Sequence, residues 1–250
     1  MSGHSKWKTN KGKKALADAK KGAAYTKIIK EITLAAREGG GNPDTNSKLR
    51  TVMLHAKEAN MPSDNVKMAI KRGTGEIPGI VYEAINYEGY GPGGVAVLIE
   101  AITDNKNRTT AEIRNILSKK NGSLGGSVAW MFIMKGYISV NKSAISEDEL
   151  MSIVLEAGAD DLKTEGDTYE VYCKPQDLEK VKSVLQAKNI KWEEAETTMI
   201  PSSSIKLNAS DARAIIALID ALEEHDDVQE VYANFDIPDE IMEQISAEEE

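Results

Sequence analysis

The 250-residue chain contains a single cysteine, Cys173, and no run of apolar residues long enough to cross a bilayer. One cysteine cannot form an intramolecular disulfide, which excludes disulfide-rich scaffolds and fits a reducing compartment. A membrane-spanning helix needs about 20 mostly apolar residues in succession. The first residues are basic but lack the apolar stretch of a secretory signal. We therefore expect a cytoplasmic protein that does not enter the membrane.

Motifs typical of metal-binding or catalytic sites are also absent from the sequence. The three histidines, His4, His55 and His225, lie far apart, and no Cys-x-x-Cys or His-x-x-x-His spacing occurs, which argues against a zinc site. Neither a Walker A sequence nor a Gly-x-Ser-x-Gly motif is present. The glycine-rich residues 89–94 precede a strand pattern, whereas a nucleotide-binding glycine loop opens a helix. The sequence therefore predicts no enzymatic activity, no metal and no cofactor.

Charge is abundant, and its two signs are separated along the chain, whose net charge is −9. Residues 1–78 contain 16 Lys and Arg against 7 Asp and Glu, a local net charge of +9, while residues 79–250 carry −18. Such asymmetry suggests that the basic part binds a polyanion. The alternative is a solubilising lysine surface on an ordinary helical domain. We favour the polyanion, because the segregation is nearly complete and Trp7 and Tyr25 lie among the lysines.

Residues 1–78 are predicted to form a basic, all-helical domain. Residues 1–22 indicate a flexible basic arm that leads into a helix. From Tyr25 to Ala36, apolar residues recur at spacings of three and four, and this helix stops at Gly39-Gly40-Gly41. Two further helices are predicted over 47–59 and from Ser63, as its N-cap, to Gly73. A linker rich in glycine and proline follows.

From residue 79 the pattern changes to strands. Two apolar runs, 81–88 and 95–102, flank the glycine-rich residues and predict a β-hairpin. A helix with a capping box of Thr109 and Glu112 follows, and then a strand over 128–134. The next residues predict a strand at 137–140, a helix with a box of Ser146 and Glu149, strands near 161–164 and 169–173, a helix through 178–185 and a strand at 191–200. This βαββαβ order is ferredoxin-like.

A last helix capped by Ser210 and a strand over 231–237 are too few to form a core alone. They either extend the ferredoxin-like unit or pack back onto residues 79–134. We favour the second, because about three strands and one helix leave one sheet face poorly covered. The predicted fold class is α+β with three domains, a helical one and two α/β sandwiches. Their boundaries are 1–78, then 79–134 plus 205–250 as a discontinuous middle domain, and 135–204 as the ferredoxin-like domain.

The basic region supplies the candidate binding residues. Lysines attract phosphates without sequence preference, and Trp7 or Tyr25 could stack on a base. The predicted nucleic-acid-binding residues are His4, Lys6, Trp7, Lys8, Lys11, Lys13, Lys14, Lys20, Lys21, Tyr25, Lys27, Lys30, Arg50, Lys71 and Arg72. The polar segment 104–109 is interpreted chiefly as an Asx-turn with a helix cap. The alternative is a secondary contact with a phosphate or partner through Lys106 and Arg108.

Several motifs make the sequence similar to a known family. They are Gly3-His4-Ser5-Lys6-Trp7, the helical stretch 27–32, Asn60-Met61-Pro62, and residues 69–73, 87–94, 103–109, 227–229 and 234–235. On these motifs the chain resembles the YebC/PmpR family from end to end. The resemblance implies three domains, the middle one built from discontinuous segments. It also implies a cytoplasmic DNA-binding transcriptional regulator without characteristic activity or cofactor, although other members act in translation through the ribosome or messenger RNA.

Three hypotheses on function follow. We favour a DNA-binding transcriptional regulator, although no helix pair is a clear helix-turn-helix with side chains suited to base edges. The alternative is a translation factor that uses the same basic surface on ribosomal or messenger RNA. A third hypothesis is an adaptor whose acidic ferredoxin-like domain binds a basic protein. The sequence does not predict the oligomeric state.

Overall fold

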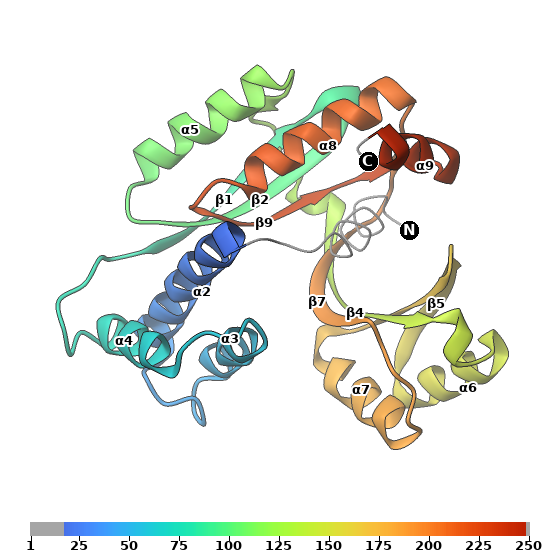
Figure 1. Ribbon diagram of the computed structural model, residues 1–250, viewed down its shortest axis with the longest axis horizontal. Helices are drawn as coiled ribbons and strands as arrows, with labels where there is room; N and C mark the ends of the chain where they lie inside the picture. Colours follow the sequence, from blue (N-terminus) through green and yellow to red (C-terminus); the bar gives the residue numbers. More distant parts are fainter. Residues whose placement is uncertain (1–17, 249–250) are drawn as a thin grey trace. The chain divides into compact units, whose positions relative to one another are not determined.

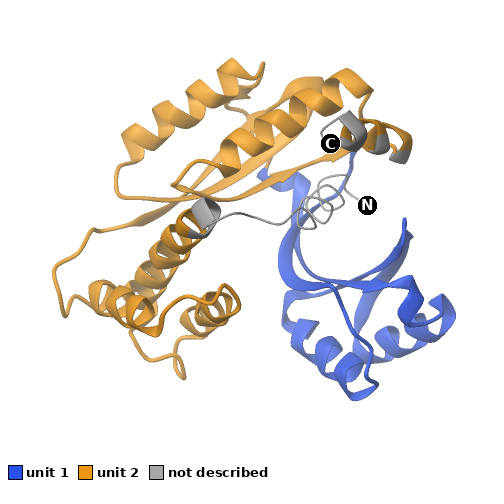
Figure 2. Cartoon of the chain, in the orientation of Figure 1, with its two compact units in different colours: residues 1–6, 129–204 blue, residues 7–128, 205–250 orange. Residues whose placement is uncertain are grey.

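The structure is a computed structural model that describes residues 18–248. By their internal contacts these residues fall into two units, coloured separately in Figure 2. Among the described residues, one unit is Ala129–Ser204, and the other joins residues 18–128 to residues 205–248. No helix among the described residues combines the length and apolar character that a bilayer crossing requires.

Three helices build the helical domain: α2 (Asp18–Gly39), α3 (Ser47–Glu58) and α4 (Ser63–Thr74). Their apolar stripes meet in a core that contains Ile32, Leu49, Val52, Ala56 and Ala69. The three predicted helices are therefore present, and each buries one face in a shared core.

Asn46 and Gly73 set how these helices pack. Asn46 caps α3 by accepting a hydrogen bond from the Leu49 amide, and its own amide group donates to the carbonyl oxygen of Ala35 at 2.8 Å. Gly73 lets α4 approach α2, because a Cβ atom there would lie 2.3 Å from the Thr33 carbonyl oxygen. The predicted cap at Ser63 is wrong. The N-cap is Pro62, which has no side-chain donor or acceptor.

The middle domain is a sheet covered by helices. It contains β1 (Glu83–Tyr90), β2 (Ala96–Thr103), α5 (Lys106–Lys119), β3 (Ser123–Leu124), α8 (Ala209–Glu223) and β9 (Val228–Ala233), and the strand order is β3-β1-β2-β9. Figure 1 shows α5 and α8 over the same sheet. Ile215 and Leu218 of α8 are buried in one core with Val97 and Ile99 of β2. The segment after residue 205 therefore packs on the hairpin, and β9 pairs antiparallel with β2.

The predicted hairpin is confirmed, because β1 and β2 pair antiparallel from Glu83 opposite Thr103 to Tyr90 opposite Ala96. The turn between them includes the short 3-10 helix Pro92–Gly94, where Gly93 and Gly94 have φ angles of 71° and 75°. Backbone in that left-handed region favours glycine. The turn therefore requires glycine at positions 93 and 94, where the backbone is left-handed. The remaining elements are the parallel pair β8 (Ile205–Lys206) and β10 (Phe235–Asp236), and α9 (Asp239–Glu248).

Two predicted caps in this domain are wrong. The N-cap of α5 is Asn105, whose side chain accepts from the Arg108 amide at 3.1 Å, so Thr109 lies inside the first turn. The N-cap of α8 is Asn208, two residues before the predicted Ser210, and it accepts from the Asp211 amide. Asparagine and threonine both serve as caps, and here the Thr109 hydroxyl instead donates to Asp227.

The unit 129–204 has the predicted βαββαβ order. Its elements are β4 (Phe132–Asn141), α6 (Glu147–Ala157), β5 (Ala159–Glu165), β6 (Thr168–Cys173), α7 (Leu178–Ala187) and β7 (Glu194–Pro201), with short 3-10 turns at Ala129–Met131, Lys142–Ala144 and Pro175–Asp177. The strand order β5-β6-β4-β7 is antiparallel throughout. That arrangement is ferredoxin-like, and the α+β class is confirmed.

The two strands predicted at 128–134 and 137–140 are one strand, β4, so this part of the prediction is wrong. Gly136, between the two predicted ranges, lies inside β4 and pairs with both Cys173 and Thr197. A Cβ atom at Gly136 would lie 2.6 Å from the Cys173 sulfur. The glycine therefore marks a close approach between strand and side chain. Ser146 precedes α6 as predicted but makes no side-chain cap bond.

Candidate nucleic-acid interface

The structure divides the predicted binding residues into four groups. Lys20 and Lys21 belong to the first turn of α2, and their side chains are outside the described part. The predicted residues of the arm, His4, Lys6, Trp7, Lys8, Lys11, Lys13 and Lys14, lie outside the described residues altogether. The other predicted residues are either exposed on the helical domain or turned into the protein.

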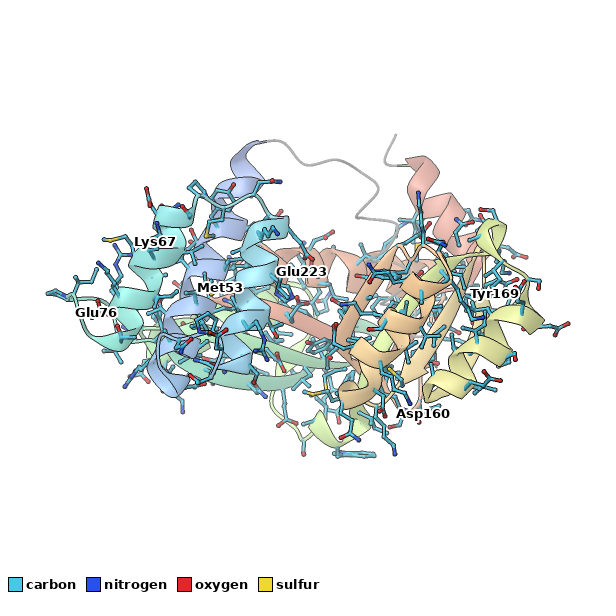
Figure 3. The ribbon with its side chains drawn as sticks, turned by 90° about the horizontal axis from the view of Figure 1, so that it is seen from below. Met53, Lys67, Glu76, Asp160, Tyr169 and Glu223 are labelled. Carbon is cyan, nitrogen blue, oxygen red and sulfur yellow. The ribbon has the colours of Figure 1, made fainter. Side chains whose placement is uncertain are left out.

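The exposed group consists of Arg50 on α3 and of Lys71 and Arg72 in the last turn of α4. Arg50 donates only a long hydrogen bond, 3.4 Å, to the Pro43 carbonyl oxygen. Lys71 and Arg72 form no ion pair within the described part of the chain. Lys67, labelled on α4 in Figure 3, adds a largely exposed cation whose contact with Asp64 is 3.5 Å long. Exposed ion pairs of this kind contribute little, so these cations are available to phosphates.

A groove of about 320 Å³ adjoins these residues, where the ends of α2 and α4 meet the linker. Arg37 and Arg72 lie on its walls, together with the backbone of Gly73 and Gly75 and the apolar residues from Ile77 to Val81. One nitrogen of Arg37 donates to the Tyr82 carbonyl oxygen at 3.1 Å. Arg37 was not among the predicted binding residues. It is an isolated basic residue at the end of α2, and the acidic Glu38 follows it directly.

Tyr25 does not stand free for stacking. Its hydroxyl donates to the carbonyl oxygens of Asn60, at 2.9 Å, and Ala59, at 3.3 Å, and its ring packs against the helical core. These contacts join α2 to the loop between α3 and α4. The expected role of Tyr25 as a base-stacking ring is therefore corrected to a structural one, because the hydroxyl and ring are already engaged.

Lys27 and Lys30 point toward the middle domain. Lys30 is only 6% exposed, and its Nζ atom lies 2.6 Å from Asp227 Oδ1 and 2.7 Å from the Asp226 carbonyl oxygen. Lys27 donates to the Glu223 carbonyl oxygen at 2.7 Å, and burial lowers its pKa. Residues three apart lie on one helix face, which here faces the turn 223–227. Lys30 is thus corrected from a phosphate contact to an internal ion pair.

Asp227 is the centre of this junction and is 3% exposed. Its Oδ2 atom accepts hydrogen bonds from the hydroxyls of Thr109, at 2.6 Å, and Thr103, at 3.1 Å, and from the Arg108 guanidinium at 2.7 Å. Burial alone would raise the pKa of Asp227. Hydrogen bonds from Lys30, Thr109 and Arg108 outweigh burial and hold that pKa well below its usual range. The carboxylate therefore stays ionised throughout the physiological range.

The outcome for segment 104–109 follows from the same contacts. Asn105 is the cap, as the Asx-turn interpretation expects. Arg108 forms ion pairs with Asp104 at 2.9 Å and Asp227 at 2.7 Å, so it is not a free phosphate contact. Lys106 is exposed at the start of α5 and remains accessible.

Glu112, His225 and Asp227 bring potential metal ligands within 4.8 Å of one another. The Asp227 amide donates to His225 Nδ1 at 3.1 Å, so the proton of a neutral imidazole is on Nε2, 3.0 Å from Glu112 Oε2. A protonated Nε2 cannot bind a metal. Lys30 and Arg108 also place two positive charges on Asp227. This set of side chains suits a fixed hydrogen-bond chain better than a metal.

The same helix brings Glu31 near two other carboxylates. Glu100 of β2 and Glu230 of β9 stand directly opposite each other in the sheet. Burial, followed by the charge of Glu230, raises the pKa of Glu31 to about 7. The pKa of Glu100 is raised for the same two reasons. The junction between α2 and the sheet therefore includes a glutamate that binds a proton near neutral pH.

Sequence reasoning missed Thr103, Thr109 and Asp227 as parts of one network. Asp227 lies in an acidic stretch and is separated from Lys30 by 197 positions. Thr109 attracted notice only as a helix cap. The one local signal was the density of hydrogen-bonding side chains around Asn105, which indicated a turn but not its distant partner.

Comparison with known proteins agrees with this architecture. A family model described as the TACO1/YebC protein N-terminal domain matches residues 5–76, and one described as the TACO1/YebC second and third domain matches residues 82–235. A protein of Syntrophus aciditrophicus is 55% identical over 250 residues, covering 99% of this chain and 100% of its own length. A Dictyoglomus turgidum protein is 52% identical over 249 residues, covering 98% and 100%. Both are named probable transcriptional regulatory proteins.

The same fold occurs in a solved structure. The crystal structure of a conserved hypothetical protein from Aquifex aeolicus is similar with a TM-score of 0.77 and 45% sequence identity, covering 90% of this chain and 94% of that one. The family models and the full-length relatives together span the helical domain and the two α/β domains. The chain belongs to the TACO1/YebC family.

Proposed function

We propose that this protein is a non-enzymatic nucleic-acid-binding regulator that acts on DNA in transcription. The observation that carries the proposal is the separation of charge, +9 over residues 1–78 and −18 over the rest. The names of the relatives support a regulatory role in transcription. The binding surface comprises the lysine-rich residues 1–17 together with Arg50, Lys71 and Arg72.

The structure sharpens which cations can contribute. Lys30 is neutralised by Asp227, so it cannot release counterions from a phosphate backbone. The exposed side chains on α3 and α4 retain that capacity. The arginine-lined groove offers two guanidinium groups, those of Arg37 and Arg72, and arginine binds phosphate through two parallel hydrogen bonds. Binding through such contacts is strong at low salt and largely independent of sequence.

A role in translation is the alternative, with ribosomal or messenger RNA as the target. It is favoured by the dominance of lysine among residues 1–30, because lysine supplies affinity more readily than base discrimination. The same exposed residues serve both functions. The two functions differ in which nucleic acid, DNA or RNA, the protein binds more tightly at a given salt concentration.

The proposal that the protein is not an enzyme rests on the hydrogen bonds that already occupy its clustered acidic and imidazole side chains. The most concentrated set of acidic and imidazole side chains in the described residues is the one around Asp227. Its members bind one another: Asp227 accepts from four side chains, and His225 is held between Glu112 and the backbone. A general base or a metal site needs an atom that is left for substrate. Hydrolysis of a nucleotide by the purified protein would overturn this part.

The experiment is a salt titration of affinity for duplex DNA and for structured RNA. One variant replaces Lys6, Lys8, Lys11, Lys13 and Lys14 with Ala, and a second combines Arg50→Ala, Lys71→Ala and Arg72→Ala. We expect each to flatten the log–log salt slope by about one unit for every phosphate that the variant no longer neutralises. The matched control for the second variant is Lys174→Ala, Lys180→Ala and Lys188→Ala in the unit 129–204, which should keep the wild-type slope.

Wild-type affinity and slope in both variants would overturn the proposal. A slope that flattens with RNA but not with DNA would favour translation over transcription. Because the control removes the same number of positive charges as the second variant, an equal fall in affinity there would show that net charge alone decides binding.

A further inference from the structure

The arginine-lined groove combines cations with an apolar surface. Its cations are Arg37 and Arg72, and its apolar side chains come mainly from the segment 77–82, which joins α4 to β1 (Figure 1). Among the described residues that line the groove, none is Asp or Glu. The groove therefore offers a positive potential beside an apolar surface.

Two glycines bring the arginines together. A Cβ atom at Gly73 would lie 3.2 Å from the Arg37 amide nitrogen, so α4 passes close to α2 where Arg37 is attached. Gly79 packs on the stem of Arg72, since a Cβ atom there would lie 3.0 Å from the Arg72 Cβ atom. Arg37 donates one hydrogen bond to the Tyr82 carbonyl oxygen, and the Arg72 guanidinium donates to no atom of the described residues. Both groups thus keep donors for an anion.

The carboxylates nearest in sequence do not neutralise the two arginines. Glu38 is paired with Lys48 at 2.8 Å, and Glu76 accepts a hydrogen bond from the Thr74 hydroxyl at 3.1 Å. Neither arginine forms an ion pair within residues 18–248. Neighbouring cations without a counter-ion repel each other, and a bound anion removes that repulsion.

Ile80 and Val81 give the groove a second property. Their side chains are 55% and 63% exposed. Adjacent exposed apolar residues beside a cavity are typical of a ligand-binding surface. A bare phosphate gains nothing from such side chains, so we infer a ligand that has an apolar part as well as a negative charge.

Size and backbone restrict the ligand further. A volume of about 320 Å³ lies at the lower end of the range for small-molecule pockets. It suits a single nucleotide, whereas a base pair is too large. The backbone amides of Gly79, Ile80 and Val81 form no hydrogen bond within the described part of the chain, so they are available to the polar edge of a base.

An acidic peptide also combines negative charge with apolar surface, but the cations of α4 favour a nucleotide. Lys67 and Lys71 are exposed and lie one helical turn apart, and Lys71 directly precedes Arg72. The positive charge therefore continues from the groove along the helix, as phosphates continue along a nucleic-acid strand. An acidic side chain carries a single charge and would use the groove alone.

We propose that the arginine-lined groove binds one unpaired nucleotide, with its phosphate between Arg37 and Arg72 and its base against Ile80 and Val81. The inference rests on the proposed function and names the form of nucleic acid that the site takes. A perfectly paired duplex can bring a phosphate to the arginines, but its bases stay in the stack. The protein then prefers bulges, loops and single strands, in DNA and RNA alike.

The test compares the affinity of the full chain for a perfect duplex with its affinity for the same duplex carrying one bulged adenosine. It is done with DNA and with RNA. Wild type should bind the bulged duplex about tenfold more tightly, as burial of part of a base against aliphatic side chains predicts. The same bulge without its base, an abasic site, should bind like the perfect duplex.

The variant Ile80→Ser/Val81→Ser removes the apolar surface and keeps every charge. The ratio of the two affinities should fall from about ten to about one. The control Leu54→Ser/Met68→Ser replaces two other exposed apolar side chains of the helical domain and should keep the ratio of wild type. Arg37→Gln should weaken binding of the bulged duplex and flatten its log–log salt slope by about one unit. Circular dichroism checks that each variant is folded.

Equal affinities of wild type for the perfect and the bulged duplex would overturn the inference and leave the proposed function standing. An abasic bulge that bound as tightly as the bulged adenosine would also overturn it, because the base would then contribute nothing. A preference kept by Ile80→Ser/Val81→Ser would place the unpaired base elsewhere.

The remaining outcomes separate this inference from the proposed function. If neither duplex binds, the proposed function fails, and the inference fails with it. Binding of a polyglutamate peptide that is lost in Arg37→Gln, without binding of nucleic acid, would assign the groove to an acidic protein and overturn the nucleotide.

Discussion

Asp227 in the middle domain and Glu170 in the ferredoxin-like domain are both nearly closed to water, yet their pKa values shift in opposite directions. Asp227 accepts from an ammonium, a guanidinium and two threonine hydroxyls, whereas Glu170 accepts from two tyrosine hydroxyls. Burial by itself raises the pKa of both carboxyl groups. The comparison indicates that hydrogen bonds from charged donors, together with their charge, keep Asp227 ionised, whereas two neutral tyrosine hydroxyls do not offset the burial of Glu170.

The largest expected effect is that of Asp227→Asn. The substitution leaves the Lys30 ammonium buried without a counter-ion, so the free energy of unfolding should fall by about 3–5 kcal/mol. Urea unfolding followed by circular dichroism measures it. The neighbouring variant Asp226→Asn is the control, since only the backbone oxygen of Asp226 contacts Lys30. Similar losses in both variants would contradict the role given to the carboxylate.

Glu31 provides a pH-dependent prediction. Its pKa is about 7 in the folded protein and 4.5 in the reference state, so the folded state binds the proton more tightly. Stability should therefore fall as the pH rises from 5 to 8, by roughly 1–3 kcal/mol. Glu31→Gln should weaken this dependence and stabilise the protein at pH 8, while the raised pKa values of Glu100 and Glu170 leave a smaller slope of the same sign. Urea titrations at several pH values measure it, with Glu38→Gln as the exposed control on the same helix.

Asp227 changes stability with pH in the direction opposite to that of Glu31. Its depressed pKa gives stability that is complete above the unfolded pKa of about 3.9 and is lost only as the solution becomes more acidic. Between pH 5 and 8 it adds no slope. A wild-type protein whose stability did not change over that interval would contradict the assignment to Glu31.

Thr109→Val tests the hydroxyls around Asp227 while keeping the side-chain shape. The loss of a hydrogen bond to a charged group should cost about 1–3 kcal/mol. Thermal or urea unfolding measures the change, and Thr51→Val, at an exposed position of α3, serves as the control. A loss no greater than that of Thr51→Val would mean that Lys30 and Arg108 suffice to hold the carboxylate.

The smallest change in stability is expected for Glu170→Gln. The amide oxygen can still accept from a tyrosine hydroxyl, and no cation among the described residues is left unpaired. The free energy of unfolding should therefore change by less than about 1 kcal/mol, in either direction. A loss comparable with that of Asp227→Asn would contradict the contrast between the two carboxylates, because it would show that the charge of Glu170 also stabilises its domain.

The fold class and most elements could be predicted because they depend on local patterns. The apolar spacing of Ile215 and Leu218, the glycine turn before Val95 and the order of elements in the ferredoxin-like unit are all visible in the sequence. The single strand β4 was predicted as two, since a glycine inside a strand, such as Gly136, and a glycine between strands look alike until the opposite side chain, Cys173, is known.

The polar junction could not be predicted for a different reason. Lys30, Thr103, Thr109 and Asp227 carry no periodicity, and the energy of their network depends on partners that only the tertiary fold brings together. Lysines at 27 and 30 resemble the basic residues at 71 and 72 in sequence. Their opposite environments are decided by the turn 223–227, which packs against one face of α2.

The pairing of β4 with β7 has a consequence for how the ferredoxin-like unit is connected to the rest of the chain. Phe132 stands opposite Pro201, and the Ser202 amide donates to the Met131 carbonyl oxygen at 2.7 Å. The ferredoxin-like unit therefore leaves and rejoins its host at neighbouring points, as a domain inserted into a loop must do. Joining the cut ends with a few residues costs little chain entropy. The strand order β3-β1-β2-β9 contains no strand of this unit, so we expect that sheet to form when the unit is replaced by a short loop.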